Sequence, residues 1–403
     1  MPCEGRPLMA LAAWSRRALT IGAAAWLVGC STGAFNSSDL LPAGQPGAPP
    51  AADPAPSFGN GGTKVGLILP LSAGGNAGAA GQAMRNAAEM ALAEFNGPSI
   101  QLVPKDDGGT AQGGQQAAQQ AIDEGAEILL GPLFAQSVSG ASQVARGRVP
   151  IIAFSTDTNV AAPGVYLLSF LPESDVDRVV TYAVSQGKRS FIGLLPSNAY
   201  GTVIEGEFKQ AVARRGARVM ALEHYADDRS RIGEAVRLVA PAASRADALF
   251  IPDGGDVVGD VMAALTAAGV NPRQFARLGT QLWDDPRIFS NPALEGGWYP
   301  APDPAGFRGF AERYRARYHQ DPPRPAALAY DAVSLVAALV KTQGSQHLSA
   351  ETLTNPSGFA GIDGVFRFRN DGTSQRGLAI LRVTPSGGQV VSPASRTFSA
   401  SAI

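Results

Sequence analysis

Residues 64–72 of the chain read KVGLILPLS, and residues 81–95 then show the apolar spacing of a helix. A continuous apolar run is typical of a strand that is buried on both faces of a parallel sheet. Further strands are expected at 100–103, 128–130 and 150–154, with helices at 112–124 and 137–146. Strands that alternate with helices in this way predict a doubly wound α/β domain with right-handed crossovers.

A second series of the same kind follows an apolar segment at 165–170. It predicts helices at 174–186, 202–215, 232–242 and 257–268, and strands at 191–195, 217–222, 248–251 and 275–278. Helical patterns return at 307–318 and 326–340, and strand patterns at 365–369 and 378–383. The expected fold class is therefore α/β, with two doubly wound parallel-sheet lobes.

The N-terminal segment has the layout of a bacterial lipoprotein signal. Arg16 and Arg17 precede an apolar stretch that ends in Leu27-Val28-Gly29-Cys30. This stretch is shorter than the roughly 20 residues that a membrane-spanning helix needs. We expect residues 1–29 to be a signal peptide and Cys30 to carry the lipid anchor. The paired arginines also resemble a twin-arginine export signal, so the export route stays open.

Composition limits the partners of the rest of the chain. Residues 30–62 consist of Cys30 and a segment rich in Ala, Pro, Gly, Ser and Asn, and this composition predicts a flexible linker. The chain has two cysteines, Cys3 and Cys30, so the mature body is expected to lack disulfides. A net charge of -1 and a pI near 6.3 argue against nucleic acid as the main partner. The lipid on Cys30 is the expected membrane contact.

Six short motifs follow one another along the body of the chain, each occurring once. They are residues 64–72 with Gly81, Asp106-Asp107-Gly108-Gly109, residues 128–132, residues 149–155, residues 196–201 and residues 329–333. In this order and spacing they resemble the type I periplasmic binding proteins of the leucine/isoleucine/valine-binding group. The resemblance runs from about residue 63 to about residue 370.

The resemblance implies two α/β lobes that are joined by three crossing strands and close around a small ligand. We expect the crossings near Phe170, Gln281 and Gly361. Lobe one is then residues 63–169 plus 284–360, and lobe two is residues 170–283 plus 361–403. Open α/β sheets bind ligands outside the carboxyl ends of their strands, which places the site in the loops after those strands.

The resemblance also implies roles for residues in these loops. Ser155, Thr156 and Thr158 match a loop that binds the ligand carboxylate, and Tyr200 matches an aromatic ligand contact. Ala135 stands where the family has a serine, with Ser137 two positions on, and Gln281 replaces an acid that pairs with the ligand ammonium. Asp253, Asp284 or Asp285 are candidates to supply that charge. The full expected site consists of Ser72, Ser137, Ser155, Thr156, Thr158, Phe170, Tyr200, Asp253, Gln281 and Tyr330.

Two functions remain open at this point. The resemblance implies a membrane-anchored periplasmic solute-binding lipoprotein that closes on a small polar, amino-acid-like ligand for an ABC-type transporter. Residues 150–157 and 167–170 also look like the penicillin-binding protein activator lipoproteins, whose related domain regulates peptidoglycan synthesis. The departures at Ala135 and Gln281 weaken the case for an amino acid, because an amide cannot supply a full charge.

Catalysis has little support in the sequence. The three histidines, His224, His319 and His347, lie far apart without the spacing of metal ligands. The mature body has no cysteine nucleophile. Asp106-Asp107 before two glycines fits turn chemistry better than a metal site, and the arginines at 308–317 fit a solvated helix face. We expect no enzyme activity, metal or cofactor.

Overall fold

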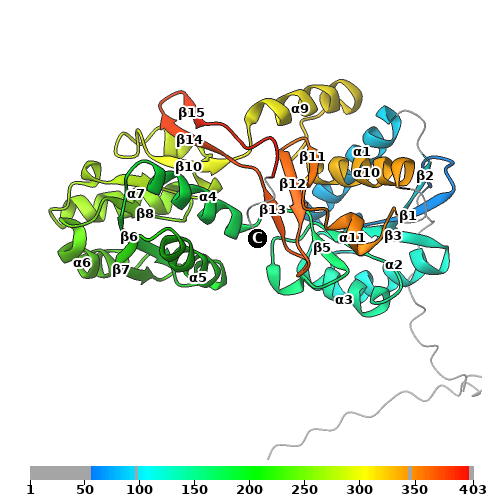
Figure 1. Ribbon diagram of the computed structural model, residues 1–403, viewed down its shortest axis with the longest axis horizontal. Coiled ribbons are helices and arrows are strands. Elements are labelled where there is room, and N and C mark those ends of the chain that lie inside the picture. The colour runs from blue at the N-terminus through cyan, green and yellow to red at the C-terminus, as the bar shows by residue number, and fades with distance from the viewer. Residues whose placement is uncertain (1–55, 96–98, 344–346, 399–403) are drawn as a thin grey trace, which may run out of the picture. The chain divides into compact units, whose positions relative to one another are not determined.

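The computed structural model describes residues 56–95, 99–343 and 347–398, and these contain two parallel-type α/β sheets and a small third sheet (Figure 1). The predicted signal peptide and Cys30 lie outside the described residues, as does the linker up to residue 55. Among the described residues, no helix is both long and apolar enough to span a membrane.

The first sheet is wholly parallel and has the strand order β2-β1-β3-β4-β5. Its strands are β1 (Thr63–Leu69), β2 (Ile100–Asp106), β3 (Ala126–Leu130), β4 (Ile151–Ala153) and β5 (Val165–Leu167). The apolar run that opens the first series forms β1, whose residues from Val65 to Leu69 are all buried. Burial on both faces explains why this run does not alternate.

Helices cover both faces of the first sheet. Leu67 and Leu69 of β1 pack with α1 (Gly75–Glu94) and α10 (Ala326–Thr342), whereas Ile68 packs with α2 (Ala111–Asp123) and α3 (Ala135–Ala145). Successive side chains of a strand point to opposite faces, so one strand supplies two cores. The helix α10 arrives from a distant part of the chain to complete the α1 side (Figure 1).

The second sheet has the order β15-β14-β10-β9-β8-β6-β7, parallel from β10 to β7 and antiparallel at β14 and β15. Its strands are β6 (Ser190–Pro196), β7 (Arg218–Tyr225), β8 (Ala248–Phe250), β9 (Ala276–Leu278), β10 (Trp298–Ala301), β14 (Ala379–Thr384) and β15 (Gly387–Ser392). The helices α4 (Pro172–Ser185) and α5 (Ala199–Arg214) cover one face, and α6 (Ile232–Ala243) and α7 (Gly255–Ala267) the other.

The remaining elements are a small third sheet and several short helices and turns. The third sheet is antiparallel and consists of β11 (Phe359–Gly361), β12 (Gly364–Phe368) and β13 (Ser374–Arg376). The shorter elements are α8 (Pro286–Phe289), α9 (Pro304–Tyr318), α11 (Ala350–Leu353) and the 3-10 turns η1 (Thr158–Val160), η2 (Pro272–Gln274) and η3 (Gln281–Trp283). The chain passes between the two large sheets after β5, after β10 and after β13.

Two of the three crossings between the large sheets lie at other positions than expected. We expected the second near Gln281, but β10 pairs with β9 and β14, so the chain leaves the second sheet after Ala301. Pro300 lies inside this internal strand, where proline is unusual, and the sequence pattern therefore hid it. We expected the third near Gly361, but Phe366 and Phe368 of β12 pack in the first core. The chain returns to the second sheet at residues 377–378.

Candidate functional site at the carboxyl ends of the strands

The loop after β1 is held by the loop after β2. The backbone N–H of Ser72 donates to Oδ1 of Asp106 over 3.1 Å, and that of Gly108 donates to the same oxygen over 2.9 Å. Burial alone would raise the pKa of Asp106, but hydrogen bonding to the Ser72 side chain and to these backbone N–H groups outweighs it and holds the pKa below its usual value. Asp106 therefore shapes the turn that presents the exposed Ser72, and the described residues contain no cluster suited to a metal.

The loop after β4 carries the three expected hydroxyl residues. The Ser155 hydroxyl oxygen is buried and accepts the backbone N–H of Asp157 over 3.1 Å, whereas Thr156 is exposed. Thr158 begins η1 and donates its hydroxyl to Oε1 of Glu173, in the first turn of α4, over 3.1 Å. Of the three, Thr156 is left with its side chain open to solvent.

Four residues at the carboxyl ends of four strands of the second sheet form a polar cluster. The hydroxyl groups of Tyr200, after β6, and Thr280, after β9, lie 3.0 Å apart. The Tyr225 hydroxyl, at the end of β7, donates to Oδ2 of Asp253, after β8, over 2.8 Å. Burial raises the pKa of both phenols, so both stay protonated and can donate. Asp253 is only partly buried and offers a carboxylate in this cluster.

A buried carboxyl group supports the cluster from α4. The backbone N–H of Gln281 donates to Oδ2 of Asp175 over 2.9 Å. Burial raises the pKa of Asp175 to about 7, with the nearby charge of Glu173 adding to the rise and the Gln281 hydrogen bond opposing it. Asp175 thereby fixes the backbone at the position where the resembled family carries an acid on the side chain.

Local sequence explains why Tyr200 stands at this edge. Asn198 caps α5, and its side chain accepts the backbone N–H of Gly201 over 2.9 Å. A Cβ atom on Gly201 would lie 1.8 Å from the carbonyl oxygen of Pro196, so this turn needs a glycine. The Pro-Ser-Asn-Ala-Tyr-Gly motif thus forms a tight strand-to-helix turn that places Tyr200 in the first turn of α5.

Three expected site residues lie elsewhere. Ser137 is buried between α3 and α2, where its hydroxyl donates to the carbonyl of Thr110 over 3.0 Å. Tyr330 donates to Oε2 of Glu94 over 2.6 Å and packs with Phe310, in the contact between α10, α1 and α9. Phe170 lies on the first crossing under two guanidinium groups, 4.7 Å from Arg376 and 5.6 Å from Arg324.

The structure adds residues that the sequence reasoning missed. Tyr225, Thr280 and Asp175 complete the cluster around Tyr200, Asp253 and Gln281. Two of them had a positional signal, because Tyr225 ends β7 and Thr280 lies two residues after β9, at the carboxyl ends of parallel strands. The other two candidate acids are already engaged, since Asp284 accepts the Tyr299 hydroxyl over 3.1 Å and Asp285 caps α8 and pairs with Arg287.

Comparisons with known proteins agree with this architecture. The model of the periplasmic binding protein family matches residues 62–389, so the chain belongs to that family. This confirms the resemblance predicted from the motifs. Proteins of this family bind solutes in the periplasm, which agrees with the expected compartment and with the expectation of a binding protein.

Solved structures share the fold at low sequence identity. A branched-chain amino acid ABC transporter protein from Rhodospirillum rubrum is 19% identical with a TM-score of 0.72, covering 82% of this chain and 99% of its own. A periplasmic ligand-binding protein for branched-chain amino acids from Burkholderia xenovorans is 16% identical with a TM-score of 0.64, covering 83% and 95%.

A third similar structure was solved with a different kind of ligand. It is a solute-binding protein from R. palustris in complex with benzoate, 20% identical with a TM-score of 0.57, covering 85% of this chain and 99% of its own. No curated protein matches the chain in sequence. At these identities the likeness confirms the expected type I periplasmic binding protein fold.

Proposed function

We propose that this protein is a periplasmic solute-binding protein that binds a small polar, amino-acid-like ligand and delivers it to an ABC-type transporter. The observation that carries the proposal is the cluster of Tyr200, Tyr225, Asp253 and Thr280 at the carboxyl ends of β6 to β9. Its two protonated phenols and one carboxylate offer donors and an anion in one place. Such a set of convergent polar groups is what a polar ligand needs for orientation.

The proposed contacts follow from the charges of these groups. Asp253 pairs with the ligand ammonium, which compensates for the amide at Gln281. Tyr225 and the backbone N–H of Gly254, which donates to Asp253 over 2.7 Å, hold that carboxylate in place. Ser72, Ser155 and Thr156, in the loops of the first sheet, bind the ligand carboxylate. A charge-assisted hydrogen bond of this kind contributes about 1.5–3 kcal/mol.

A thermal-shift panel of amino acids, small peptides and amides tests this function. A ligand at about 100 times its Kd adds about 2.7 kcal/mol to the free energy of unfolding, which is a clear rise in Tm. Asp253→Asn should remove the rise for ligands with an ammonium group. The control is Asp260→Asn, which removes an exposed aspartate of α7. A panel without any rise in Tm contradicts the proposed function.

The membrane anchor is a separate part of the proposal. Residues 1–29 are proposed to be cleaved, and Cys30 to be lipidated in the cell envelope, with residues 30–62 as the tether. Cys30→Ala should move the protein from the membrane fraction to the soluble periplasmic fraction while its Tm stays unchanged. Retention of the variant in the membrane fraction contradicts the lipid anchor.

A second candidate function is favoured by the departures at Ala135 and Gln281. In it the domain acts as a penicillin-binding protein activator, with a cell-wall synthase as the partner instead of a transporter permease. Capture of partners from a detergent extract, followed by a transpeptidase assay with the soluble body, distinguishes the two. Recovery of a synthase with increased transpeptidation supports the second candidate, and recovery of a permease supports the first.

A further inference from the structure

A cavity lies apart from the polar cluster of Tyr200, Tyr225, Asp253 and Thr280, which we call the strand-end cluster. It has a volume of about 800 Å³ and is enclosed by α4 and α5, by β12 and β13, and by the chain after β15. None of the ten expected ligand residues lines it. Small-molecule sites in proteins have volumes of about 300–1,000 Å³, so the cavity is large enough for a small organic ligand.

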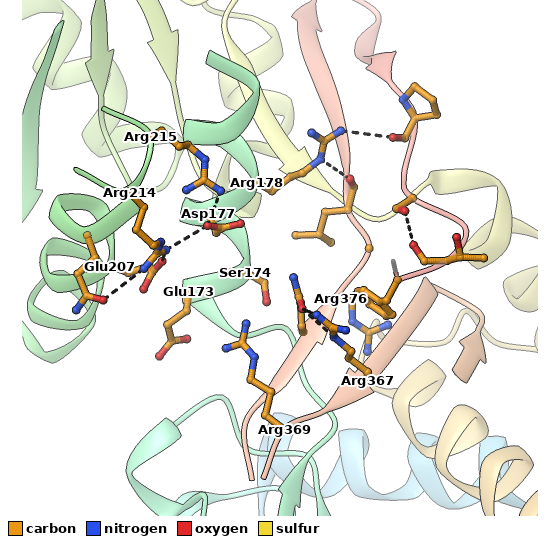
Figure 2. Close-up of a pocket in the computed structure, with 18 residues that line it drawn as sticks. Glu173, Ser174, Asp177, Arg178, Glu207, Arg214, Arg215, Arg367, Arg369 and Arg376 are labelled. Carbon is orange, nitrogen blue, oxygen red and sulfur yellow. Dashed lines mark hydrogen bonds and ion pairs between the residues drawn. The ribbon is translucent and has the colours of Figure 1, made fainter. Parts of the chain in front are cut away.

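Arginine dominates the lining of this cavity (Figure 2). Six arginines line it, namely Arg178, Arg214, Arg215, Arg367, Arg369 and Arg376, and three carboxylates face them, namely Glu173, Asp177 and Glu207. The formal charge of the lining is therefore +3. A concave surface with one dominant sign concentrates the opposite charge.

The positive charge is balanced at the helical side. Arg214 pairs with Glu207 and Asp177, and Arg215 donates to Asp177 over 2.8 Å. Arg178 donates to the Leu378 carbonyl and the Ser392 hydroxyl, both over 2.7 Å. These contacts use two of the three carboxylates on this side, Asp177 and Glu207, and tie α4 to the chain around β14 and β15.

The positive charge is not balanced at the sheet side. Arg367 donates to neutral acceptors only, Gln375 over 2.7 Å and the Pro356 carbonyl over 3.1 Å. The exposed Arg369 has no side-chain partner among residues 56–398 that the structure describes. Burial lowers the pKa of Arg367, and the nearby positive charge of Arg369 lowers it further.

A carboxylate with a free acceptor faces these arginines. Figure 2 shows Arg369 extending from the sheet side across the cavity toward Glu173 and Ser174 of α4. Glu173 accepts the Thr158 hydroxyl at one oxygen, and its other oxygen is buried without a hydrogen bond in the described part of the chain. The cavity therefore offers two cations for an anion and one acceptor for a hydroxyl group.

We propose that this cavity is a second ligand site, distinct from the strand-end cluster, for a small hydroxylated organic anion with two or more negative charges. Arg367 and Arg369 bind the oxyanions, and Glu173 and Ser174 bind the hydroxyl group. Carboxylate and phosphate share the chemistry that a guanidinium recognises. Such a ligand joins α4 to the third sheet, from which the chain crosses to the second sheet at residues 377–378.

Isothermal titration of the purified chain with citrate and with glycerol 2-phosphate tests the site, at about 0.15 M NaCl to suppress weak surface binding. We expect at least one of the two anions to bind. Arg369→Gln should weaken binding about tenfold or more, as for loss of a charge-assisted contact. Arg369→Glu should abolish it, and the Tm of unliganded Arg369→Gln should not fall, because the exposed side chain makes no hydrogen bond or ion pair that this change would remove.

Two controls separate the site from general electrostatics and from the proposed function. Arg308→Gln removes an exposed arginine of α9 outside the cavity and should leave binding unchanged. Asp253→Asn should also leave anion binding unchanged. The inference is overturned by the absence of heat with both anions, by equal weakening in Arg308→Gln, or by binding that survives Arg369→Glu.

Discussion

Asp175 is the residue whose ionisation is most tightly coupled to the fold near the candidate site. Its pKa is raised from 3.8 to about 7, mainly by burial. Between these values the unfolded chain releases the proton and the folded chain keeps it, so stability falls as pH rises. The contribution is fully present below about pH 4 and is lost above about pH 7, a difference of the order of a few kcal/mol.

Asp175→Asn should therefore raise the Tm at pH 8 and flatten the fall in stability between pH 4 and 7. An asparagine can still accept the Gln281 N–H, but it carries no charge that burial would penalise. Denaturant unfolding at several pH values measures the profile. Part of the fall should remain, because burial also raises the pKa of Asp331 to about 7. A variant with an unchanged profile contradicts the assignment, and Asp260→Asn is the exposed control.

The structure shows where the expected site residues lie, and their contact with a ligand stays a prediction. Tyr200 was expected from the resemblance and Asp253 from its loop after a strand, and both lie at the carboxyl edge of the second sheet. Ser137 and Tyr330 were chosen by alignment to a motif, and each makes its contact inside a helix interface instead. Asp175 was missed because an acid in the first turn of a helix is ordinary, and its burial depends on a loop more than one hundred residues away.

At the scale of elements, the contact between α2 and α3 depends on two glycines. A Cβ on Gly140 would lie 1.9 Å from the Ala111 carbonyl oxygen, and a Cβ on Gly114 would lie 2.3 Å from that of Ser137. These carbonyl oxygens belong to the helix backbone, so neither can make room for a Cβ atom unless its helix moves. The close approach of these helices over the first sheet is therefore set by residues without side chains.

Gly140→Ala should lower the free energy of unfolding by about 1–3 kcal/mol, because it forces two packed helices apart. Gly206→Ala is the matched control, since it lies inside α5 with no atom within 4 Å of the added Cβ. That control should stabilise the protein by about 0.5–1 kcal/mol through helix propensity. Denaturant titration of both variants measures the difference. Equal effects in the two helices contradict the packing argument.

Elements with a clear apolar pattern were predictable, whether long or short, and elements without one were not. The strand at β1 and the helix α10 were expected close to their observed bounds, because each carries a long run of one pattern. The helix α1 begins at Gly75, six residues before the expected start, because Gly, Asn and Ala in its first turn carry no apolar period. The strand β10 was missed because four residues with a proline do not resemble an internal strand.

At the scale of the whole molecule, four charged residues meet where the first sheet, the third sheet and the crossings join. Arg324 pairs with Asp363 over 2.7 Å, and the buried Arg376 lies near Asp331 and Asp363. Burial raises the pKa of Asp331, and the charge of Arg376 opposes the rise. Removing one partner of such a buried set leaves an uncompensated charge.

Arg376→Met should thus destabilise the protein by about 3–5 kcal/mol at pH 8. Adding Asp331→Asn should restore part of that loss, because the second change removes the charge that the first leaves unpaired. Arg308→Met, on an exposed surface of α9, is the control and should change little. A double variant less stable than the sum of the two single effects contradicts the electrostatic coupling.

The order of segments in the first core has a consequence for synthesis of the chain. The apolar face of α1, with Met84, Ala88 and Leu92, is covered by α10 and lies in one cluster with Phe366 and Phe368. A nascent chain therefore cannot close this core until residues near its C-terminus have left the ribosome. For most of translation the N-terminal segments present an open apolar surface, which is the state that chaperones bind and that export machinery can thread.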